Sequence, residues 1–518
     1  MKRNLLLGLI LISVLTFSQN SSTAKFKIGK IHLKSATKVI TEFVGIDGTD
    51  LYITHKDYQG YTLSDFCIEK NLTLSDSVVS KDIRLTKDGI GGNFEFATVF
   101  NGKVLIFFTI KDKKSDLNQL YVQSINKESL VLNHDMKLIN TTELIGDGVN
   151  GGTYFSYIIS QDKSKIVIKS ATKLLSEKKG NAHYTALDNE LNILWDKDIP
   201  LHYNGLYLSV FYETFENDGN LFLVSIPNKT LINKKAYIDP NYNNIIIAIT
   251  DNGKKITQFP VGVDEYFLPH MCLEPIGEDK LICIGFYSDK NSFIVKGCYS
   301  IIFDYSKNEI ISKDFSEFKG NFINRFISKN TNRNSMYDDL KGYKGLLYDY
   351  FFSDITFQGD KGIVVSEQFY NGDSEKPIPQ GLYHGSLIVI SFDKNGKIND
   401  PIIIPKYQSG NYQVGNSYLK LHVNNEIYLI FNDTPKNNNP KEKDKIYGYS
   451  NTLGIDKNTE TVLIKIDENY NLSRETLFNY DNIETLLYLP FSEQINDNEA
   501  LLYCKKYRYS RIVRLTIK

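Results

Sequence analysis

The sequence predicts an all-β fold, a β-propeller built from four-stranded blades. Three observations lead to this prediction: two interleaved series of tight turns separate strand-like runs along the whole chain, helical periodicity is nearly absent, and the two ends together complete one blade. The turn count favours eight blades. Seven remains the alternative if the weakly spaced units near residues 320–350 are assigned differently.

The chain begins with the pattern of a secretory signal peptide over residues 1–18. Lys2 and Arg3 form a basic start, residues 5–17 form an apolar run, and residues 16–18 form a cleavage site. The apolar run is shorter than the roughly 20 residues that a transmembrane helix needs. An uncleaved amphipathic first helix is the alternative. We therefore expect an exported protein, periplasmic or extracellular, with no membrane span.

The first turn series is rich in Asp, Asn and Glu. Such residues favour turns because their side chains bond to nearby backbone N–H groups and their backbones accept positive φ. Strand-like runs flank each turn, as in residues 186–195. The seven turns lie at residues 69–71, 126–127, 188–190, 251–253, 304–305, 393–396 and 467–469.

The second series alternates with the first and contains Asp-Gly and Asn-Gly pairs. These pairs between alternating apolar runs are the strongest short signal of a β-hairpin. The eight turns lie at residues 47–48, 101–102, 162–163, 218–219, 278–279, 359–360, 424–425 and 496–497.

Each unit therefore holds four strands, A to D, with the second series joining A to B and the first joining C to D. In the second blade they are residues 94–100, 103–110, 117–125 and 130–139. The last unit supplies only strands A (485–490), B (500–506) and C (511–517). We predict that residues 25–33 supply its strand D, which closes the ring and removes exposed sheet edges. Residues 25–518 then form a single propeller domain.

The A–B and C–D turns are short and share one face, so the longer B–C and D–A loops emerge on the other. Long loops on a rigid scaffold are where binding residues concentrate. We expect an insert with a short helix (residues 321–330) within 316–349. We also expect a loop at 432–460 whose polar part, 434–445, is disordered. The long loops are residues 171–181, 227–243, 371–383, 432–460, 316–345 and 406–416.

Five cysteines are sparse and carry no metal-ligand spacing. Cys272 and Cys283 flank a predicted hairpin turn almost symmetrically, so a cross-strand disulfide is one possibility and buried free thiols are the favoured one.

Composition excludes a nucleic-acid partner, since 60 basic residues balance 61 acidic ones and no basic stripe occurs. The eight histidines show no zinc-type spacing, and we expect no metal and no cofactor. The acidic turns at 393–396 and 467–469 resemble calcium loops but lack the full ligand series.

Two glycine-rich loops, residues 88–94 and 147–155, precede inner strands but no helix follows them, so a phosphate-binding loop is excluded. Crowding at the inner strands accounts for the glycines. Hydrolysis would need two carboxylates near the propeller axis, and the candidates are Glu95, Glu213, Glu274 and Glu367.

The region from residue 341 to the C-terminus is the least generic part of the chain. It contains KGYKGLLYDYFFSDI (341–355), GIVVSEQFY (362–370), YHG (383–385), IPKYQ (404–408) and LIFNDTPKN (429–437). With these segments the chain resembles a group of secreted bacterial β-propeller proteins of largely uncharacterised function. The resemblance implies the fold and export and brings no catalytic residues.

Eight residues of this region are predicted to lie at strand ends or loops of the long-loop face. They are our candidate binding residues: Glu367, Tyr370, Tyr383, His384, Lys406, Tyr407, Gln408 and Asn432. We expect a binding or scaffold protein for a peptide, glycan or protein partner, acting through shape and hydrogen bonds. The alternative is a propeller hydrolase acting on glycans or esters at the mouth of the central channel.

Overall fold

The computed structural model describes most of the chain. The described residues are 18–20, 23–33, 38–57, 65–112, 115–143, 153–172, 181–230, 236–237, 243–292, 295–319, 350–372, 381–410, 416–438, 449–450, 459–506 and 509–518. The predicted signal peptide up to residue 17 and the predicted helix at 321–330 lie outside them.

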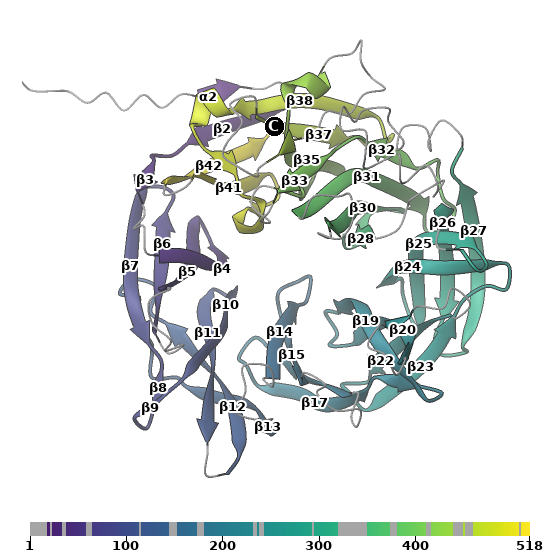
Figure 1. The fold of residues 1–518 in the computed structure, drawn as a ribbon, viewed down its shortest axis with the longest axis horizontal. Coiled ribbons are helices and arrows are strands. Elements are labelled where there is room, and N and C mark those ends of the chain that lie inside the picture. Colours follow the sequence, from purple (N-terminus) through teal and green to yellow (C-terminus); the bar gives the residue numbers. More distant parts are fainter. Residues whose placement is uncertain are drawn as a thin grey trace, which may run out of the picture.

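Eight antiparallel sheets surround the centre of a ring, which makes the fold an eight-bladed β-propeller (Figure 1). Each blade runs from an inner strand A to an outer strand D. Blade 1 comprises β4 (Lys38–Asp47), β5 (Asp50–Asp57), β6 (Asp65–Leu72) and β7 (Ser77–Arg84), and blade 2 comprises β10 (Asn93–Phe100), β11 (Lys103–Asp112), β12 (Leu117–Ile125) and β13 (Lys137–Glu143). Blade 3 comprises β14 (Thr153–Ile159), β15 (Ile166–Thr172), β16 (Asn181–Leu187) and β17 (Ile193–Pro200), and blade 4 comprises β19 (Leu206–Phe215), β20 (Leu221–Thr230), β22 (Asn244–Thr250) and β23 (Lys255–Val261).

The second half of the ring follows the same pattern, with inner or outer strands broken into two pieces in blades 6 and 8. Blade 5 comprises β24 (Tyr266–Pro275), β25 (Lys280–Asp289), β26 (Val295–Asp304) and β27 (Glu309–Glu317), and blade 6 comprises β28 (Tyr350–Phe352) with β29 (Thr356–Gln358), β30 (Lys361–Gly372), β31 (Gly381–Asp393), and β32 (Ile402–Ile404) with β33 (Gln408–Gly410). Blade 7 comprises β34 (Leu419–Val423), β35 (Glu426–Asp433), β37 (Glu460–Ile466) and β38 (Leu472–Asn479), and blade 8 comprises β39 (Leu486–Leu487) with β40 (Glu493–Asn496), β41 (Glu499–Lys506), β42 (Tyr509–Ile517) and β2 (Ala24–Ile28).

Short elements complete the chain between and beside the blades. They are β1 (Ser18–Asn20), β3 (His32–Leu33), β8 (Thr86–Lys87), β9 (Ile90–Gly91), β18 (His202–Tyr203), β21 (Ala236–Tyr237), β36 (Tyr449–Ser450), the helix α2 (Tyr480–Ile483) and the 3-10 turns η2 (Pro435–Asn438) and η4 (Leu489–Phe491).

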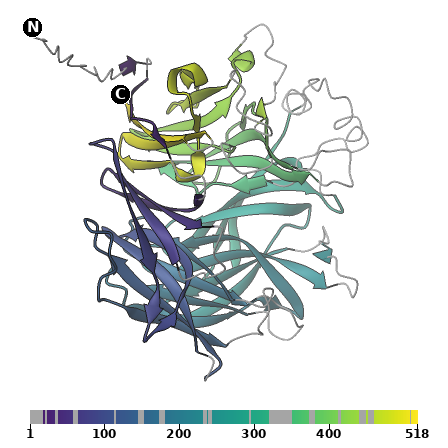
Figure 2. The same ribbon diagram turned by 60° about the vertical axis from the view of Figure 1, so that its left-hand side comes forward.

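The ring closes as predicted, because the N-terminal strand β2 pairs with β42 from Ala24 opposite Ile517 to Ile28 opposite Val513. Figure 2 shows the C-terminus beside this purple N-terminal strand. The pairing gives blade 8 its outer strand, so the predicted closing segment is confirmed.

Turn chemistry explains the positions of most hairpins. Asn101, Gly102, Asn424 and Asn425 have positive φ in their A–B turns, which Asn and Gly accept at little cost. In C–D turns the side chain of Asp188 accepts hydrogen bonds from the N–H groups of residues 190 and 192. Asp393 and Asp467 repeat this pattern.

The first predicted C–D turn is wrong. Residues 69–71 lie inside β6, and the turn follows it, with Asp76 at positive φ. Glu69 and Asn71 are buried polar strand residues: Glu69 accepts from Asn71 Nδ2 and contacts His55 Nε2, both at 2.9 Å. The amide of Asn71 and the carboxylate of Glu69 are therefore hydrogen-bonded to each other within the sheet, and these residues do not form a turn.

Cys272 and Cys283 are free and buried. Cys272 lies opposite Ile284, whereas Cys283 lies opposite Leu273. Because adjacent residues of a strand point to opposite faces, the two thiols belong to different hydrophobic clusters, one on each side of blade 5. A disulfide between them is excluded.

Gly92, in the first glycine-rich loop, supports the crowding explanation. A Cβ there would lie 2.7 Å from the ring of Phe108 on β11. Residues 147–152 of the second loop are outside the described ranges.

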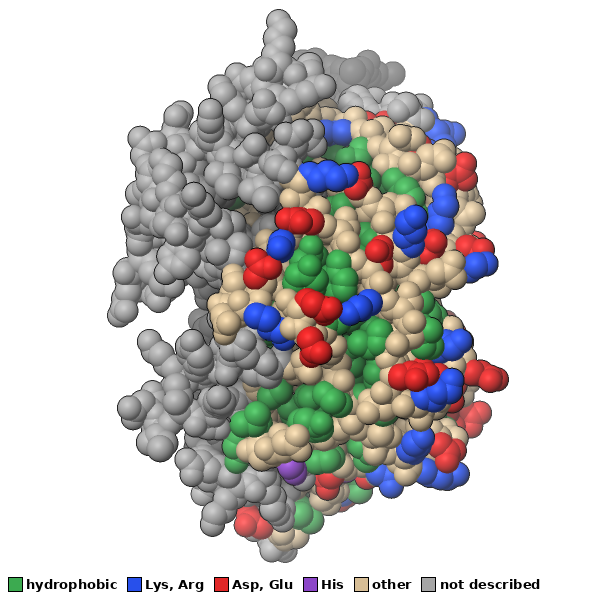
Figure 3. All heavy atoms as spheres, turned by 90° about the vertical axis from the view of Figure 1, so that its right-hand side faces the viewer, with side chains coloured by type: hydrophobic (Ala, Val, Ile, Leu, Met, Phe, Trp, Pro, Cys, Tyr) green, Lys and Arg blue, Asp and Glu red, His purple; other side chains and the backbone are tan. Residues whose placement is uncertain are grey.

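The blades pack on one another through apolar side chains. One cluster joins blades 1 and 2 through residues such as Phe66 and Phe94, whose rings lie 4.6 Å apart. The outer surface is mixed: in Figure 3 side chains of both charges are interspersed with hydrophobic ones on the side of the ring facing the viewer. Exposed apolar side chains such as Ile311 and Leu138 are ordinary on a protein surface.

The segment predicted to be disordered begins with an ordered turn. Pro435–Asn438 forms η2, and the amides of Asn437 and Asn438 donate to Asp433 and Glu460 at 2.6 Å each. These two bonds tie the start of the segment to blade 7. Residues 439–448 lie outside the described ranges.

Candidate functional site

A bulge in blade 6 brings Glu367 of β30 close to His384 of β31. The pairing shifts between Glu367 opposite Leu387 and Phe369 opposite His384, so β31 contains an extra residue. Gly385 occupies the bulge, where a Cβ would lie 2.6 Å from Gln368 Oε1. Bulges re-aim side chains, and this one puts the imidazole rather than Gly385 opposite Phe369.

Glu367 is the centre of a buried polar group. Its carboxylate accepts from Lys406 Nζ at 2.5 Å and from Ser417 Oγ at 2.6 Å, and it lies 3.0 Å from His384 Nδ1. Burial by itself would raise the pKa of Glu367, but Lys406 and His384 outweigh it and hold the pKa at about 2. Burial lowers the pKa of Lys406, and Glu367 opposes this. The two groups form an ammonium–carboxylate pair within the protein.

The group extends from blade 6 to blade 7 and on to blade 8. Lys406 Nζ donates to Gln408 Oε1 at 3.0 Å, and Gln408 Nε2 donates to the carbonyl of Asn432 at 2.8 Å. Asn432 Nδ2 then donates to the carbonyl of Leu487 at 2.8 Å. Three consecutive blades are therefore joined by hydrogen bonds from residues that are all almost fully buried.

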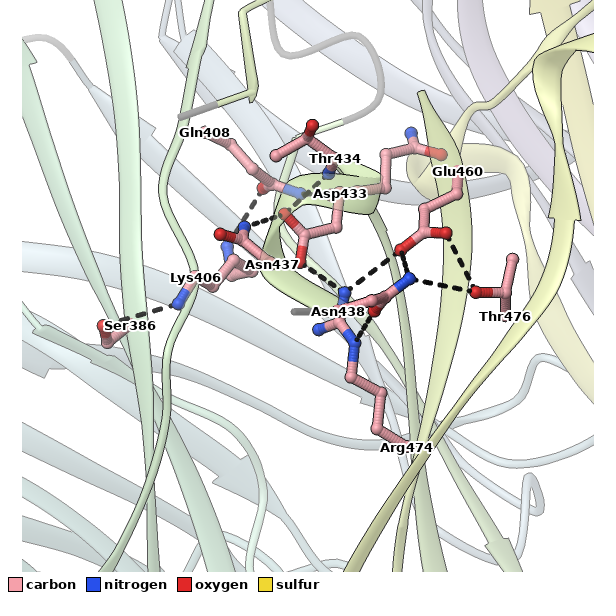
Figure 4. A network of polar contacts seen from close by, with 11 residues as sticks. Ser386, Lys406, Gln408, Asp433, Thr434, Asn437, Asn438, Glu460, Arg474 and Thr476 are labelled. Carbon is pink, nitrogen blue, oxygen red and sulfur yellow. Dashed lines mark hydrogen bonds and ion pairs between the residues drawn. The ribbon is translucent and has the colours of Figure 1, made fainter. Parts of the chain in front are cut away.

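A second ionic cluster adjoins this one in blade 7 (Figure 4). Arg474 lies between Asp433 and Glu460, with N–O distances of 2.8 and 3.3 Å. Burial raises the pKa of Asp433, and Arg474 opposes that rise. Thr476 Oγ1 donates to Glu460 at 2.9 Å. This cluster fixes the loop end of blade 7 next to Gln408 and Lys406.

Five of the eight predicted residues therefore meet: Glu367, His384, Lys406, Gln408 and Asn432. Tyr383 and Tyr407 lie beside them with ring centroids 6.2 Å apart, Tyr383 buried and Tyr407 half-buried. For Tyr370 only the backbone is described, paired with Tyr383.

The sequence prediction missed Ser417, Arg474 and Glu460. Ser417 follows directly on the predicted loop 406–416 and lies two residues before the inner strand β34, so its position could have been recognised in the sequence. A buried carboxylate requires a cation, but nothing in the spacing of Asp433 and Arg474 identifies them as partners.

In the part of the chain that the structure describes, His384 of this group and Asn416, the residue before Ser417, carry buried polar atoms without a hydrogen-bond partner. His384 Nε2 is one, and Asn416 Nδ2 and Oδ1 are the others, with Asn416 2% exposed. The next residue, Ser417, has φ of +79°, a conformation that a residue with a side chain rarely adopts. Strain and unsatisfied polar groups gather at functional sites more often than elsewhere.

Aromatic rings connect this polar group to the surface. The ring of Phe369 lies 4.9 Å from that of His384, and Phe351 on the inner strand β28 lies 5.2 Å from Phe369. Phe351 is 61% exposed. Exposed aromatic side chains also occur on two other inner strands, at Tyr154 of β14 and Phe211 of β19.

The other candidate glutamates belong to separate blades. Glu95 accepts from Thr109 Oγ1 at 2.7 Å, and Glu213 accepts from Lys169 Nζ at 2.6 Å and Tyr184 at 2.7 Å. Glu274 differs from both. Burial, followed by the nearby Glu216 and Asp354, raises its pKa to about 8 despite the opposing charge of Lys420.

Across the described residues, no three or more His, Cys, Asp or Glu side chains are grouped as metal ligands. Within the same ranges no helix has the length and apolar character needed to cross a membrane.

No family model matches the sequence, and no curated protein matches it. Solved structures that are similar include the Dos1 propeller, with 8% identity, 94% of both chains covered and a TM-score of 0.39. The β-propeller domain of the Trilobed protease from Pyrococcus furiosus has 11% identity over 86% of this chain and 97% of that chain, with a TM-score of 0.34. A member of the DUF4221 family from Bacteroides vulgatus has 12% identity over 74% and 93%, with a TM-score of 0.29. These are likenesses of fold, and they transfer no activity or ligand to this chain.

Proposed function

We propose that the protein binds a peptide, glycan or protein partner at the inner strands, on the side where these strands begin and the long loops emerge. The observation that carries this proposal is the exposure of Phe351, Phe211 and Tyr154 on inner strands of three blades. Large exposed aromatic side chains on a rigid scaffold are typical of binding sites, because they bury much apolar area at low entropic cost.

The polar group around Glu367 supports binding without covalent chemistry. A carboxylate that already accepts hydrogen bonds from Lys406 and Ser417 and has a pKa of about 2 is a poor proton acceptor at neutral pH. Its role in this proposal is to hold His384 and Ser417 in place.

The test is a glycan and peptide array probed with the wild-type protein and with Phe351→Ala and Phe211→Ala. Leu138→Ala, on the outer strand β13, is the matched control because Leu138 is exposed to 44%. We expect signals that both inner-strand variants reduce about tenfold and that the control retains. Silence across the array would remove peptide and glycan ligands and leave a protein partner, and equal signals from all variants would contradict a site at the inner strands.

A second candidate function, hydrolysis of glycans or esters, is favoured by Glu274. With a pKa of about 8, the carboxyl of Glu274 is protonated at neutral pH, and it lies near the carboxylates of Glu216 and Asp354. Glycoside hydrolysis uses such a pair, in which the protonated carboxyl acts as the acid and an ionised carboxylate acts as the base. Turnover of aryl glycosides or esters that Glu274→Gln abolishes would support it. No turnover by the wild-type protein would remove it.

We also propose export, supported by the basic and apolar pattern of residues 1–18. N-terminal sequencing of protein recovered from the periplasm or medium should begin just after residue 18. A chain that retains Met1 in the cytoplasm would contradict export.

A further inference from the structure

We propose that the surface of the inner strands binds a cationic peptide, a segment of a partner protein that is rich in Lys or Arg. This inference rests on the proposed binding function and names the chemistry of its partner. Two features of the inner strands carry it: their side chains are predominantly acidic where they are charged, and the acidic groups lie beside exposed aromatic rings.

Acidic side chains gather on the inner strands, which surround the centre of the ring (Figure 1), although the whole chain has a net charge of only -1. Among the inner-strand side chains that the structure describes, Lys420 of β34 is the only lysine or arginine. Carboxyl side chains on or beside these strands come from blades 1, 2, 4, 5, 6 and 8, and each is at least partly exposed: Glu42, Glu95, Glu213, Glu216, Glu274, Asp354 and Glu493. This surface therefore attracts cations even though the molecule as a whole does not.

Lysines pair with only part of this acidic surface, in the ion pairs Lys169–Glu213 (2.6 Å) and Lys163–Glu493 (3.6 Å). Lys420 Nζ donates to uncharged oxygens, among them the carbonyl of Asp354 at 2.7 Å and Thr356 Oγ1 at 3.0 Å. Within the described ranges, three carboxyl groups of blades 4, 5 and 6 form no ion pair: Glu216, Glu274 and Asp354. These groups are the part of the surface that a cationic partner would neutralise.

The hydroxyl of Tyr212, on the inner strand β19, lies within this acidic group. Its oxygen is buried and has no hydrogen-bond partner in the described part of the chain. Burial raises the pKa of Tyr212, and neighbouring acidic groups raise it further: Cys272, Asp354, Glu274 and Glu216. Carboxylate and phenol oxygens all accept hydrogen bonds, so N–H donors that carry a positive charge match the set.

Exposed aromatic side chains lie next to the acidic ones along the chain. Phe211 is the extra residue of a bulge in β19, and Glu216 follows it directly after the strand ends. In blade 6, Phe351 of β28 precedes the exposed Asp354. Aromatic faces attract cations as well as apolar groups. Acidic groups beside aromatic rings therefore favour Lys and Arg side chains over neutral ligands.

The length of this surface favours a peptide over a small cation. A strand rises about 3.3 Å per residue, which separates Phe211 from Glu216 by roughly 16 Å. A single amine contacts only one end of such a surface, whereas the side chains of an extended peptide reach both ends. A metal ion is not favoured, since no His, Cys, Asp and Glu side chains are grouped as metal ligands across the described residues.

Glu274 should link binding to pH. Burial and the neighbouring carboxylates raise its pKa to about 8, so it is protonated at neutral pH. A bound cation favours the ionised carboxylate, so binding should release a proton, and affinity should rise as the pH increases from about 6.5 to about 8.5. The titratable groups around Glu274 belong to its own strand and to blades 4, 6 and 7: Cys272, Tyr212, Glu216, Asp354 and Lys420.

The measurement is titration calorimetry with an oligolysine peptide, an oligoglutamate and a neutral peptide of the same length, spermidine and neutral oligosaccharides. We expect oligolysine to bind and the double variant Glu216→Gln with Asp354→Asn to weaken its binding about tenfold. Glu309→Gln is the matched control and should leave binding unchanged, because this carboxylate is 57% exposed on the outer strand β27. The double variant removes charges that repel one another, so its melting temperature should hold or rise.

Calorimetry in buffers of different ionisation enthalpy should detect the released proton for the wild type and none for Glu274→Gln. Two results would overturn the cationic partner: oligolysine binds no more tightly than oligoglutamate, or Glu309→Gln weakens binding as much as the double variant. Binding without proton release would remove Glu274 from the surface. Spermidine that binds as tightly as oligolysine would refute a peptide.

The same panel separates this inference from the broader one. Binding of the neutral peptide or an oligosaccharide that depends on Phe351, but not on Glu216 and Asp354, would refute the cationic partner and keep the proposed binding function. Oligolysine binding that Phe351→Ala and Phe211→Ala leave unchanged would keep the cationic partner and contradict a site at the exposed aromatic side chains.

Discussion

Glu367 and Glu274 are both glutamates withdrawn from solvent in the same propeller, but their pKa values move in opposite directions. At the junction of blades 6 and 7, Lys406 and His384 outweigh burial, and the pKa of Glu367 falls to about 2. On the inner strand of blade 5, burial and two neighbouring carboxylates outweigh Lys420, and the pKa of Glu274 rises to about 8. A cation in direct contact therefore decides which carboxyl is ionised, and burial alone does not.

The largest expected effect comes from removing the cation that pairs with Glu367. Lys406→Met leaves a buried carboxylate without its partner, which costs about 3–5 kcal/mol. We expect a large fall in the melting temperature, most of it restored by the double variant Lys406→Met with Glu367→Gln, in which no charge remains. The exposed pair Lys319–Asp400 is the control, since Lys319→Met should change stability by less than about 1 kcal/mol. Equal falls in the melting temperature for Lys406→Met and Lys319→Met would contradict the conclusion that Glu367 depends on a cation in direct contact.

Glu367 and Glu274 should make the stability of the protein depend on pH in opposite directions. The folded pKa of Glu367 is below its ordinary value of 4.5, so its contribution to stability is present above pH 4.5 and is lost as pH falls towards 2. Melting temperatures measured over this range should fall more steeply for the wild type than for Glu367→Gln, which does not titrate. Parallel curves would show that Glu367 is not the ionised partner.

Glu274 should give the opposite pH dependence. Its folded pKa of about 8 exceeds 4.5, so the unfolded chain loses the proton first and stability falls as pH rises from 4.5 to 8. Glu274→Gln removes this decline and should stabilise the protein at pH 8 by about 1 kcal/mol or more. A variant whose stability still falls over that window at the wild-type rate would argue against a protonated Glu274.

The bulge at Gly385 should give the smallest effect. Gly385→Ala places a Cβ 2.6 Å from Gln368 Oε1, and the flexible Gln368 side chain must move at a cost of about 0.5–1.5 kcal/mol. Adding Gln368→Ala should remove most of that cost. If the double variant stays as unstable as the single one, the bulge depends on the backbone conformation of Gly385 and not on the side-chain contact.

The fold could be predicted from the sequence because turn chemistry is local. Asp393 and Asp467 bond to residues two and four positions ahead, so their spacing is visible in the chain. The error at Glu69 has a physical cause, because its turn-like carboxylate pairs with His55, a residue of the neighbouring strand.

The candidate site could be predicted only in part. The sequence predicts that Glu367, His384 and Lys406 lie at strand ends or loops of the long-loop face. In the structure the carboxylate of Glu367 contacts both other side chains. The partnership of Ser417 with Glu367 depends on how blade 7 packs on blade 6, and that packing is set by apolar surfaces with no sequence signature of their own.

The pairing of β2 with β42 has a consequence for how the protein folds. Seven blades each form from residues close together in the chain, whereas the eighth requires residue 24 to meet residue 517. Contacts of such long separation are slow to form because of the entropy of closing the loop. We therefore expect the ring to exist first as an open arc of seven blades and to lock last, after the final strand has been synthesised.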